Sequence, residues 1–232
     1  MTAATGSVLD VDLDGLAGVL AVPDGDGPWP GVVVLHEAAG LNADTRRICR
    51  HLAGMGYVAL APALFDGGPR CIARTVRDML DPTRRSTTDR VEHARAWLAD
   101  RPIVDADRIG VIGFCMGGGF AVTAAARSPF AAAAVNYGRV PADPELFAGS
   151  CPVVGNYGAN DPLIPDDTPE RYRAALTAAG VPVDIEVFEG VGHSFMNDEP
   201  ALLGPLGIRY DGPTAERAWE RIERFFAVHL HG

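Results

Sequence analysis

The chain has 232 residues, of which 47% are hydrophobic, and this length and composition fit one globular domain over residues 1–232. The formal net charge of −10 disfavours binding to nucleic acid, whose phosphates need a basic face, and to an anionic membrane surface. All 20 basic residues are arginine, which excludes chemistry that needs a lysine, such as a Schiff base or a P-loop.

In chain order, the first predicted element is an antiparallel hairpin within about the first 25 residues, around an Asp14-Gly15 turn. From residue 32 onward, short apolar segments alternate with helical ones. The predicted strands span residues 32–37, 57–62, 109–114, 131–137, 152–157 and 183–188. The predicted helices span residues 42–55, with Asn42 as N-cap, 86–100, 116–127, 168–179 and 214–229. Uninterrupted apolar strands between helices predict the α/β class, with a mostly parallel central sheet covered by helices on both faces.

Neither a secretory signal nor a membrane-spanning segment is predicted. The N-terminus lacks a basic region followed by an apolar run, and no stretch approaches the roughly 18 uninterrupted apolar residues of a membrane helix. The four cysteines at 49, 71, 115 and 151 show no CxxC spacing typical of zinc or thioredoxin-like motifs. We therefore expect a cytoplasmic protein with reduced thiols, no bound metal and no cofactor.

A glycine-flanked cysteine is the strongest candidate for a nucleophile. Residues 113–117 read Gly-Phe-Cys-Met-Gly, the G-x-nucleophile-x-G pattern, between a predicted strand and a predicted helix. The sharp turn leaves no room for side chains at Gly113 and Gly117. At a helix N-terminus the amides and the helix dipole favour the thiolate of Cys115, and the N–H of Met116 points to where an oxyanion would form. The alternative is that Cys115 is a small buried hydrophobic residue.

A base and an acid should follow such a nucleophile along the chain, the acid first. His193 stands in a glycine-flanked loop directly after a predicted strand, whereas the other two downstream histidines lie at the C-terminus. Asp161 follows the preceding strand and comes before a proline, so it is the candidate that orients the imidazole. Asp166 and Asp167 are rivals, although they look like an N-cap pair for the next helix.

The loop after the strand at 32–37 is a candidate for the second half of an oxyanion hole, with the N–H of Ala38 as donor. Glu37 is an acid at the end of an apolar strand. It is either a surface residue or, by its position, a neighbour of the nucleophile turn. His36-Glu37 does not begin a metalloprotease motif, because position 40 is glycine.

These motifs together resemble the dienelactone hydrolase family (carboxymethylenebutenolidases) of α/β-hydrolases. The resemblance covers nearly the whole chain and rests on HEAAGLN at 36–42, YVALAPALF at 57–65, DADRIGVIGFCMGG at 105–118, NYG at 136–138, GANDPLIP at 158–165 and GHSFMN at 192–197. The cysteine within GFCMGG and the glutamate of the upstream loop are specific to this family among hydrolases. The resemblance implies a triad of Cys115, His193 and Asp161, and an oxyanion hole made by the amides of Met116 and Ala38.

The resemblance also implies that Glu37 accepts the thiol proton when substrate binds, which protects the resting cysteine from oxidation. Dienelactone hydrolases hold a substrate carboxylate with two arginines, and the chain departs from this pattern. Asn197 stands at one of the two positions, four residues after the histidine, as a substrate-binding candidate. The other position falls in the shorter segment 65–85, where Arg70, Arg74 and Arg77 are candidates. Loss of one arginine removes a bidentate clamp and puts dienelactone itself in doubt as the substrate.

The least regular segment, residues 64–85, is predicted to be a lid or a loop that borders the site. Three aromatic residues, Phe65, Tyr137 and Phe195, either line an apolar substrate pocket or belong to the core.

The predicted function is hydrolysis of a small ester or lactone through an acyl-enzyme on Cys115, by a monomer or a weak homodimer. One alternative is a thiol sensor or a ligand-binding protein that kept the fold without turnover, since fold alone does not fix function. Another is acyl transfer or peptide cleavage on the same triad.

Overall fold

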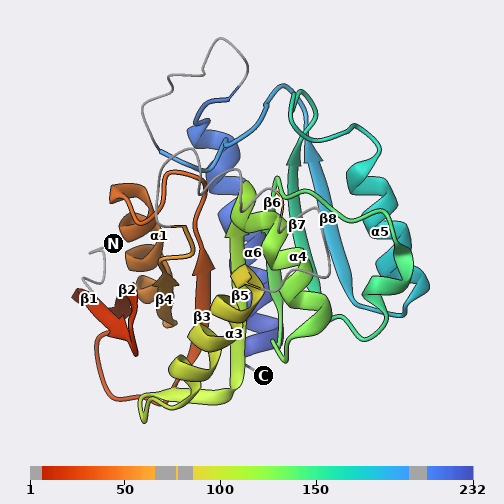
Figure 1. The fold of residues 1–232 in the computed structure, drawn as a ribbon. Coiled ribbons are helices and arrows are strands. Elements are labelled where there is room, and N and C mark those ends of the chain that lie inside the picture. The colour runs from red at the N-terminus through yellow and green to blue at the C-terminus, as the bar shows by residue number, and fades with distance from the viewer. Residues whose placement is uncertain (1–6, 66–76, 78–85, 199–207, 232) are drawn as a thin grey trace.

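The structure is a computed structural model that describes residues 7–65, 77, 86–198 and 208–231. The strands of these residues form one sheet in the order β1-β2-β4-β3-β5-β6-β7-β8 (Figure 1). Their bounds are β1 Ser7–Leu13, β2 Leu16–Val22, β3 Trp29–Leu35, β4 Val58–Pro62, β5 Val104–Phe114, β6 Ala133–Asn136, β7 Val153–Gly158 and β8 Val183–Phe188. All neighbours from β4 to β8 pair in parallel, whereas β2 pairs antiparallel with β1 and β4, so the predicted mostly parallel sheet is confirmed.

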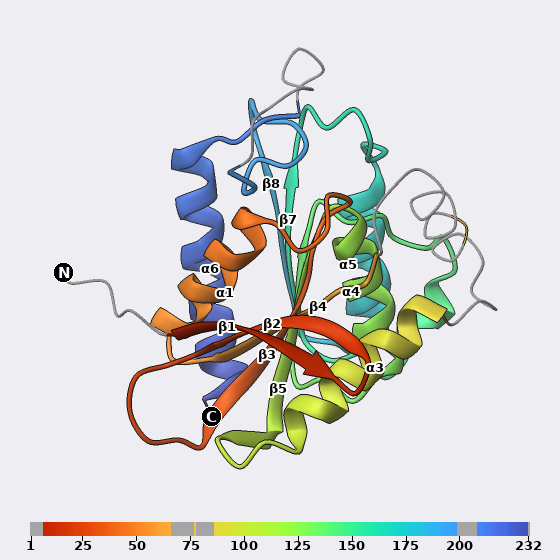
Figure 2. The same ribbon diagram turned by 60° about the vertical axis from the view of Figure 1, so that its left-hand side comes forward.

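Helices cover both faces of the sheet, as predicted. They are α1 Ala43–Gly54, α3 Ser86–Ala99, α4 Met116–Arg127, α5 Thr168–Ala178 and α6 Gly212–Leu230, with a short 3-10 helix at Pro144–Phe147. Figure 2 shows α1 and α6 on one face and α3, α4 and α5 on the other. Two separate apolar clusters correspond to these two layers, one with Ile48 and Phe226, the other with Val91 and Leu176. Because both faces are buried, the central strands carry apolar side chains on both sides.

Several predicted elements match the structure closely. The hairpin β1–β2 turns at Asp14 and Gly15, whose φ angles are 53° and 96°. Helix α4 and strand β8 have the predicted bounds, and the Asn42 side chain caps α1 by accepting a hydrogen bond from the N–H of Thr45 at 2.8 Å. Local turn and capping chemistry was therefore a reliable guide at these places.

The bounds of several strands differ from the prediction, most of all in β3, β5 and β6. Strand β3 ends at Leu35 rather than Glu37, so His36 and Glu37 already belong to the loop. Strand β5 begins at Val104, because residues 104–105 pair with the start of β3 across an irregularity in register, although the mostly polar residues 105–108 follow before the apolar run. Strand β6 is shorter than predicted and ends at Asn136.

The carboxyl ends of the parallel strands bring the candidate residues to one edge of the sheet. Glu37 follows β3, Cys115 follows β5, Tyr137 follows β6, Asp161 follows β7 and His193 follows β8. This is the edge at which open α/β sheets bind ligands. The predicted lid falls mostly on residues outside the described ones, so it stays a prediction. Within the described residues, no helix has both the length and the apolar character needed to cross a bilayer.

Candidate active site

Cys115 occupies a strained turn between β5 and α4. Its backbone has φ 54° and ψ −115°, a conformation that a side-chain-bearing residue adopts only when its surroundings impose it. A Cβ atom added to Gly113 would lie 2.1 Å from the carbonyl oxygen of Gly117, and one added to Gly117 would lie 2.1 Å from that of Leu35. The steric reason given for the two flanking glycines therefore holds in the structure.

The thiol of Cys115 is half-exposed, unlike the buried thiol of Cys49. Burial raises the pKa of Cys49 to about 12, and it raises the pKa of Cys151 to about 12 as well. Thiols with such pKa values are protonated and poorly nucleophilic at neutral pH. Cys71 lies outside the described residues. Of the three described cysteines, Cys115 is thus the one in a setting suited to nucleophilic chemistry.

His193 is bound to Asp161 in the interior of the loop region. The Nδ1 atom of His193 lies 2.7 Å from Oδ2 of Asp161, and both side chains are almost fully buried. The other carboxylate oxygen, Oδ1, accepts the N–H groups of Leu163 and Ile164 at 2.8 and 3.2 Å. With the carboxylate fixed in this way, Nδ1 carries the proton and Nε2 is left to face the reacting group. The rivals at 166 and 167 are exposed, and residue 167 is at the N-cap position of α5.

The second ring nitrogen of His193, Nε2, is buried and has no hydrogen-bond partner among the described residues. Burial lowers the pKa of His193, but the hydrogen bond with Asp161 and the nearby thiol of Cys115 outweigh it and raise the pKa to about 9. The structure therefore brings Cys115, His193 and Asp161 together, with the imidazole between the thiol and the carboxylate.

The upstream loop is held by its own side chains. Glu37 is half-buried, and its carboxylate accepts the N–H of Ala39 and the Nδ2 of Asn42, each at 3.0 Å. Burial is the main cause that raises the pKa of Glu37 above its ordinary value. Among the backbone hydrogen bonds outside helices and strands, none within the described residues engages the N–H of Ala38 or of Met116. These two amides remain the candidate donors to a developing oxyanion.

His36 also holds the loop that follows β3. Its Nε2 accepts the N–H of Leu64 at 3.1 Å, and its Nδ1 lies 2.7 Å from the carbonyl oxygen of Glu37. Burial lowers the pKa of His36, which keeps the ring neutral and able to make both contacts. The ring of Phe65 packs edge-on against this imidazole and also contacts Phe120, within the core.

Three other substrate-binding candidates, Tyr137, Phe195 and Asn197, lie inside the fold. Tyr137 and Phe195 are fully buried and pack against each other at 5.2 Å between ring centroids, which favours the core alternative for both. Asn197 is buried, accepts the hydroxyl of Tyr137 at 2.5 Å and donates to Asp44 at 2.9 Å. Arg70 and Arg74 lie outside the described residues.

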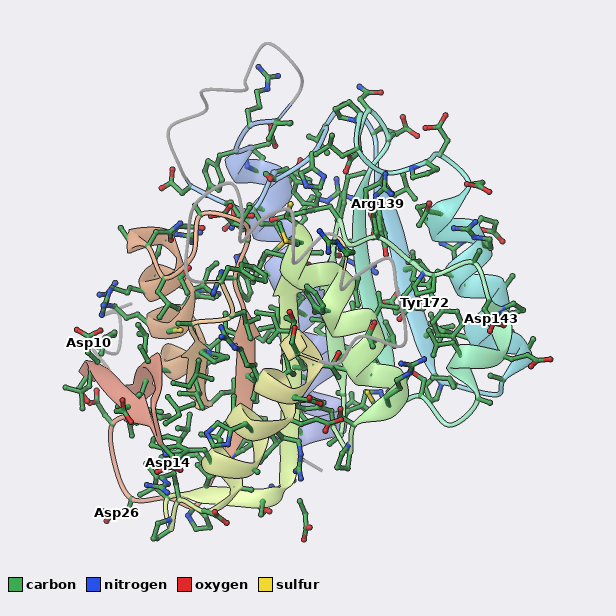
Figure 3. The ribbon with its side chains drawn as sticks, viewed as in Figure 1. Asp10, Asp14, Asp26, Arg139, Asp143 and Tyr172 are labelled. Carbon is green, nitrogen blue, oxygen red and sulfur yellow. The ribbon has the colours of Figure 1, made fainter. Side chains whose placement is uncertain are left out.

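Two buried asparagine side chains, those of Asn136 and Asn156, support the turn that carries Cys115. This role was not predicted for them from the sequence. Asn136 donates from Nδ2 to the carbonyl oxygen of Gly113 at 3.1 Å, and its own carbonyl accepts the N–H of Cys115 at 3.1 Å. Asn156 donates to Oδ1 of Asn136 at 2.9 Å and accepts Nε of Arg221 at 3.2 Å. The available signal was that the triplet Asn-Tyr-Gly occurs twice, once at residues 136–138, where β6 ends, and once at the end of β7. Arg139 lies just past the first of these triplets and is exposed (Figure 3).

The fold and the site together define an α/β-hydrolase. One solved structure, an α/β hydrolase enzyme from a Medee basin deep-sea metagenome library, shares the fold with a TM-score of 0.74 at 15% identity, covering 99% of this chain and 100% of that one. A dienelactone hydrolase-like promiscuous phosphotriesterase from metagenomic libraries superposes with a TM-score of 0.82 at 26% identity, covering 97% and 98%.

The chain belongs to the dienelactone hydrolase family, which it matches over residues 16–230. A relative from Yersinia pestis, provisionally named carboxymethylenebutenolidase, is 32% identical over 235 residues, 93% of this chain and 85% of its own length. The family resemblance and the prediction of an enzyme of the ester- and lactone-hydrolase class are thereby confirmed at the level of the family.

Proposed function

We propose that this chain hydrolyses carboxylic esters or lactones of small molecules with Cys115 as the nucleophile. The observation that carries the proposal is the imidazole of His193, bound through Nδ1 to Asp161 at 2.7 Å and presenting a buried, unpartnered Nε2 beside the half-exposed thiol. An acceptor aimed at a thiol, with a carboxylate behind it, is the arrangement that nucleophilic acyl chemistry needs.

The reaction proceeds in two halves on these side chains. The sulfur of Cys115 attacks the carbonyl carbon, and its proton passes to Nε2 of His193. The amides of Met116 and Ala38 stabilise the oxyanion. Collapse of the tetrahedral species breaks the bond to the alcohol oxygen, which takes the proton from His193 and leaves an acyl-cysteine. Water then gives a proton to His193, attacks the thioester and releases the acid, and the proton returns to sulfur.

Glu37 is proposed as a second acceptor for the thiol proton, used when substrate binds. Burial raises the pKa of its carboxyl group, which brings the group nearer to the range in which it can exchange a proton at neutral pH. Its two hydrogen bonds to Ala39 and Asn42 also hold the loop that carries the Ala38 amide.

The acyl group proposed for the substrate is a neutral one. The side chain of Asn197 carries no positive charge and is committed to Tyr137 and Asp44, so it cannot replace an arginine that binds a carboxylate. A panel of neutral lactones, aryl esters, a dienelactone and an aryl phosphotriester compares these classes. Neutral lactones and aryl esters should be turned over fastest, and a preference for the dienelactone would contradict this part of the proposal.

Labelling of the thiols tests the nucleophile directly. Iodoacetamide should modify Cys115 much faster than Cys49 or Cys151, and the loss of esterase activity should follow the modification of Cys115, as mapped by mass spectrometry. A thiol sensor would show the same selective labelling with ester turnover no faster than without the protein, and that result would favour the non-hydrolytic alternative.

A further inference from the structure

A buried carboxylate at the start of α1 joins this helix to the loop that carries His193. Asp44 is only 4% exposed. Its Oδ2 atom accepts Nδ2 of Asn197 at 2.9 Å, and its Oδ1 atom accepts the N–H of Asp198 at 3.2 Å and Nε of Arg47 at 2.7 Å. Arg47 in turn donates to the carbonyl oxygen of Met196 at 3.1 Å. Three consecutive residues of the loop, 196–198, are thus bound to the N-terminal end of one helix.

Burial of the Asp44 carboxylate carries a cost in hydration free energy. A buried carboxylate loses several kcal/mol of hydration unless charged or hydrogen-bonded partners replace the water. Two of the partners of Asp44 come from residues 153 and 154 positions away in the chain rather than from its own helix. The helix dipole also favours a carboxylate at this end of α1. While the loop covers the carboxylate, the hydrogen bonds from Asn197 and Asp198 replace part of the lost water, which ties the position of the loop to this contact.

Tyr137 connects the contact between Asp44 and Asn197 to the imidazole of His193. The hydroxyl of Tyr137 donates to Oδ1 of Asn197 at 2.5 Å. The ring of Tyr137 packs edge-on against the ring of His193, with 5.0 Å between centroids and 64° between planes. Tyr137 is fully buried and has a φ of 41°, so its backbone is held in an unfavourable conformation by its surroundings. Asp44, Asn197 and Tyr137 thus form one chain of contacts that ends on the proposed base.

The same helical turn also holds the loop with the proposed oxyanion donor. Asn42, the N-cap, donates from Nδ2 to Glu37 at 3.0 Å. Thr45 donates from its hydroxyl to the carbonyl oxygen of Gly40 at 3.1 Å. Because residues 42–45 contact both loops, a displacement of this turn would move the oxyanion donor and the base together.

We propose that the first turn of α1 is the common anchor of the two loops around Cys115, and that Asp44 and Asn197 are positioning residues for His193. The inference rests on the proposed function. Neither residue touches the reacting atoms; each acts by holding the imidazole in line with the thiol. A displacement of about 1 Å in such a site costs on the order of 10²-fold in rate, so the loss of an anchor should appear in catalysis before it appears in binding.

The test is Asp44→Asn, which keeps size and shape but gives the buried site an amide that cannot accept all three donors. It should lower kcat by about 10-fold or more on an aryl ester and change KM by less than about threefold. The pH dependence of Cys115 alkylation by iodoacetamide should change as well, because it reports the thiol and imidazole without turnover. The matched control is Asp10→Asn: Asp10 lies on β1, is exposed, and pairs with Arg46 of the same helix α1 (Figure 3). It should leave kcat, KM and the alkylation profile unchanged.

A rescue variant separates positioning from simple destabilisation. In Asp44→Asn/Asn197→Asp the amide and the carboxylate exchange places, so the pair between α1 and the loop, and the bond from Tyr137, can form again. Recovery of most of kcat and of the alkylation profile is the expected result. The proposal is overturned if Asp44→Asn stays within about twofold of the wild type with an unchanged profile. It is also overturned if the exchange restores the melting temperature while kcat and the profile stay impaired.

These outcomes are distinguishable from failure of the proposed function. If Cys115→Ala retains turnover, the nucleophile is wrong, whatever Asp44→Asn does. If Cys115→Ala is inactive and Asp44→Asn is normal, the nucleophile stands and only the anchor fails.

Discussion

At the scale of single residues, the imidazole of His193 decides what the site can do. Its pKa is raised to about 9, because the hydrogen bonds and charges from Asp161 and Cys115 outweigh the opposing effect of burial. A base with this pKa takes up a proton readily at neutral pH, so it can accept the proton that leaves the thiol of Cys115 during attack. The ring then acts as the acid that protonates the leaving alcohol.

The value of kcat/KM should therefore fall at high pH, near 9, where His193 no longer keeps a proton for the leaving alcohol. Asp161→Asn removes the carboxylate that helps to raise this pKa, so the alkaline limb should move to lower pH and the maximum rate should drop. Protonation of His193 also stabilises the fold, because its pKa is higher in the folded state than in the unfolded state. This contribution to the free energy of unfolding is fully present below about pH 6.5 and is lost as the pH rises through about 9. An alkaline limb that is unmoved in Asp161→Asn would show that His193 is not the group being titrated.

Glu37→Gln tests the proposed second acceptor. The amide keeps the length of the side chain and can still accept from Asn42, but it cannot take up a proton, so kcat/KM on an aryl ester should fall by about 10²-fold. Glu216→Gln is the matched control, because Glu216 is exposed on α6. Equal rates for Glu37→Gln and the wild type would limit Glu37 to a structural role in its loop.

At the scale of elements, the nucleophile turn depends on a close approach between backbones. Gly117→Ala would place a Cβ atom 2.1 Å from the carbonyl oxygen of Leu35, so the turn or β3 would have to move. We expect the free energy of unfolding to fall by about 3 kcal/mol, at the upper end of the usual cost of overpacking, together with loss of activity. Urea unfolding measures this loss, and Gly212→Ala, whose nearest neighbour would lie 3.6 Å away at the start of α6, is the control. A Gly117→Ala protein as stable as the control would contradict the close contact between β3 and the turn as the reason for the glycine.

Those elements that local chemistry specifies could be predicted from the sequence. The Asp14-Gly15 turn, the Asn42 cap and the glycines around Cys115 are set by neighbours within a few residues, and each was found where it was predicted. The start of β5 was missed because residues 104–105 join the sheet by pairing with β3, and the mostly polar residues 105–108 separate them from the apolar run at 109–114. Pairing partners distant in sequence decide such boundaries.

At the scale of the whole molecule, the site exists because parallel strands deliver residues from five separate loops to one edge of the sheet. The order of the proposed nucleophile, acid and base follows from the sequence, because each candidate comes after a strand with a recognisable turn. The buried hydrogen bonds that support the site could not be predicted from the sequence. One joins Asp44 to Asn197, 153 positions apart, and another joins Asn136 to Asn156, 20 positions apart. Nothing local in the sequence marks one buried polar side chain as the partner of another. The role of Asn197 changed accordingly, from a residue expected to face the substrate to one bound inside the fold.

The most direct test of the central claim is the turnover of an aryl ester by Cys115→Ala, compared with Cys151→Ala as a control at a second cysteine that lies away from the nucleophile turn. Circular dichroism should first show that both variants are folded. The account predicts background hydrolysis for Cys115→Ala and wild-type kcat/KM for Cys151→Ala. Turnover by folded Cys115→Ala at a rate near that of the wild type would contradict it.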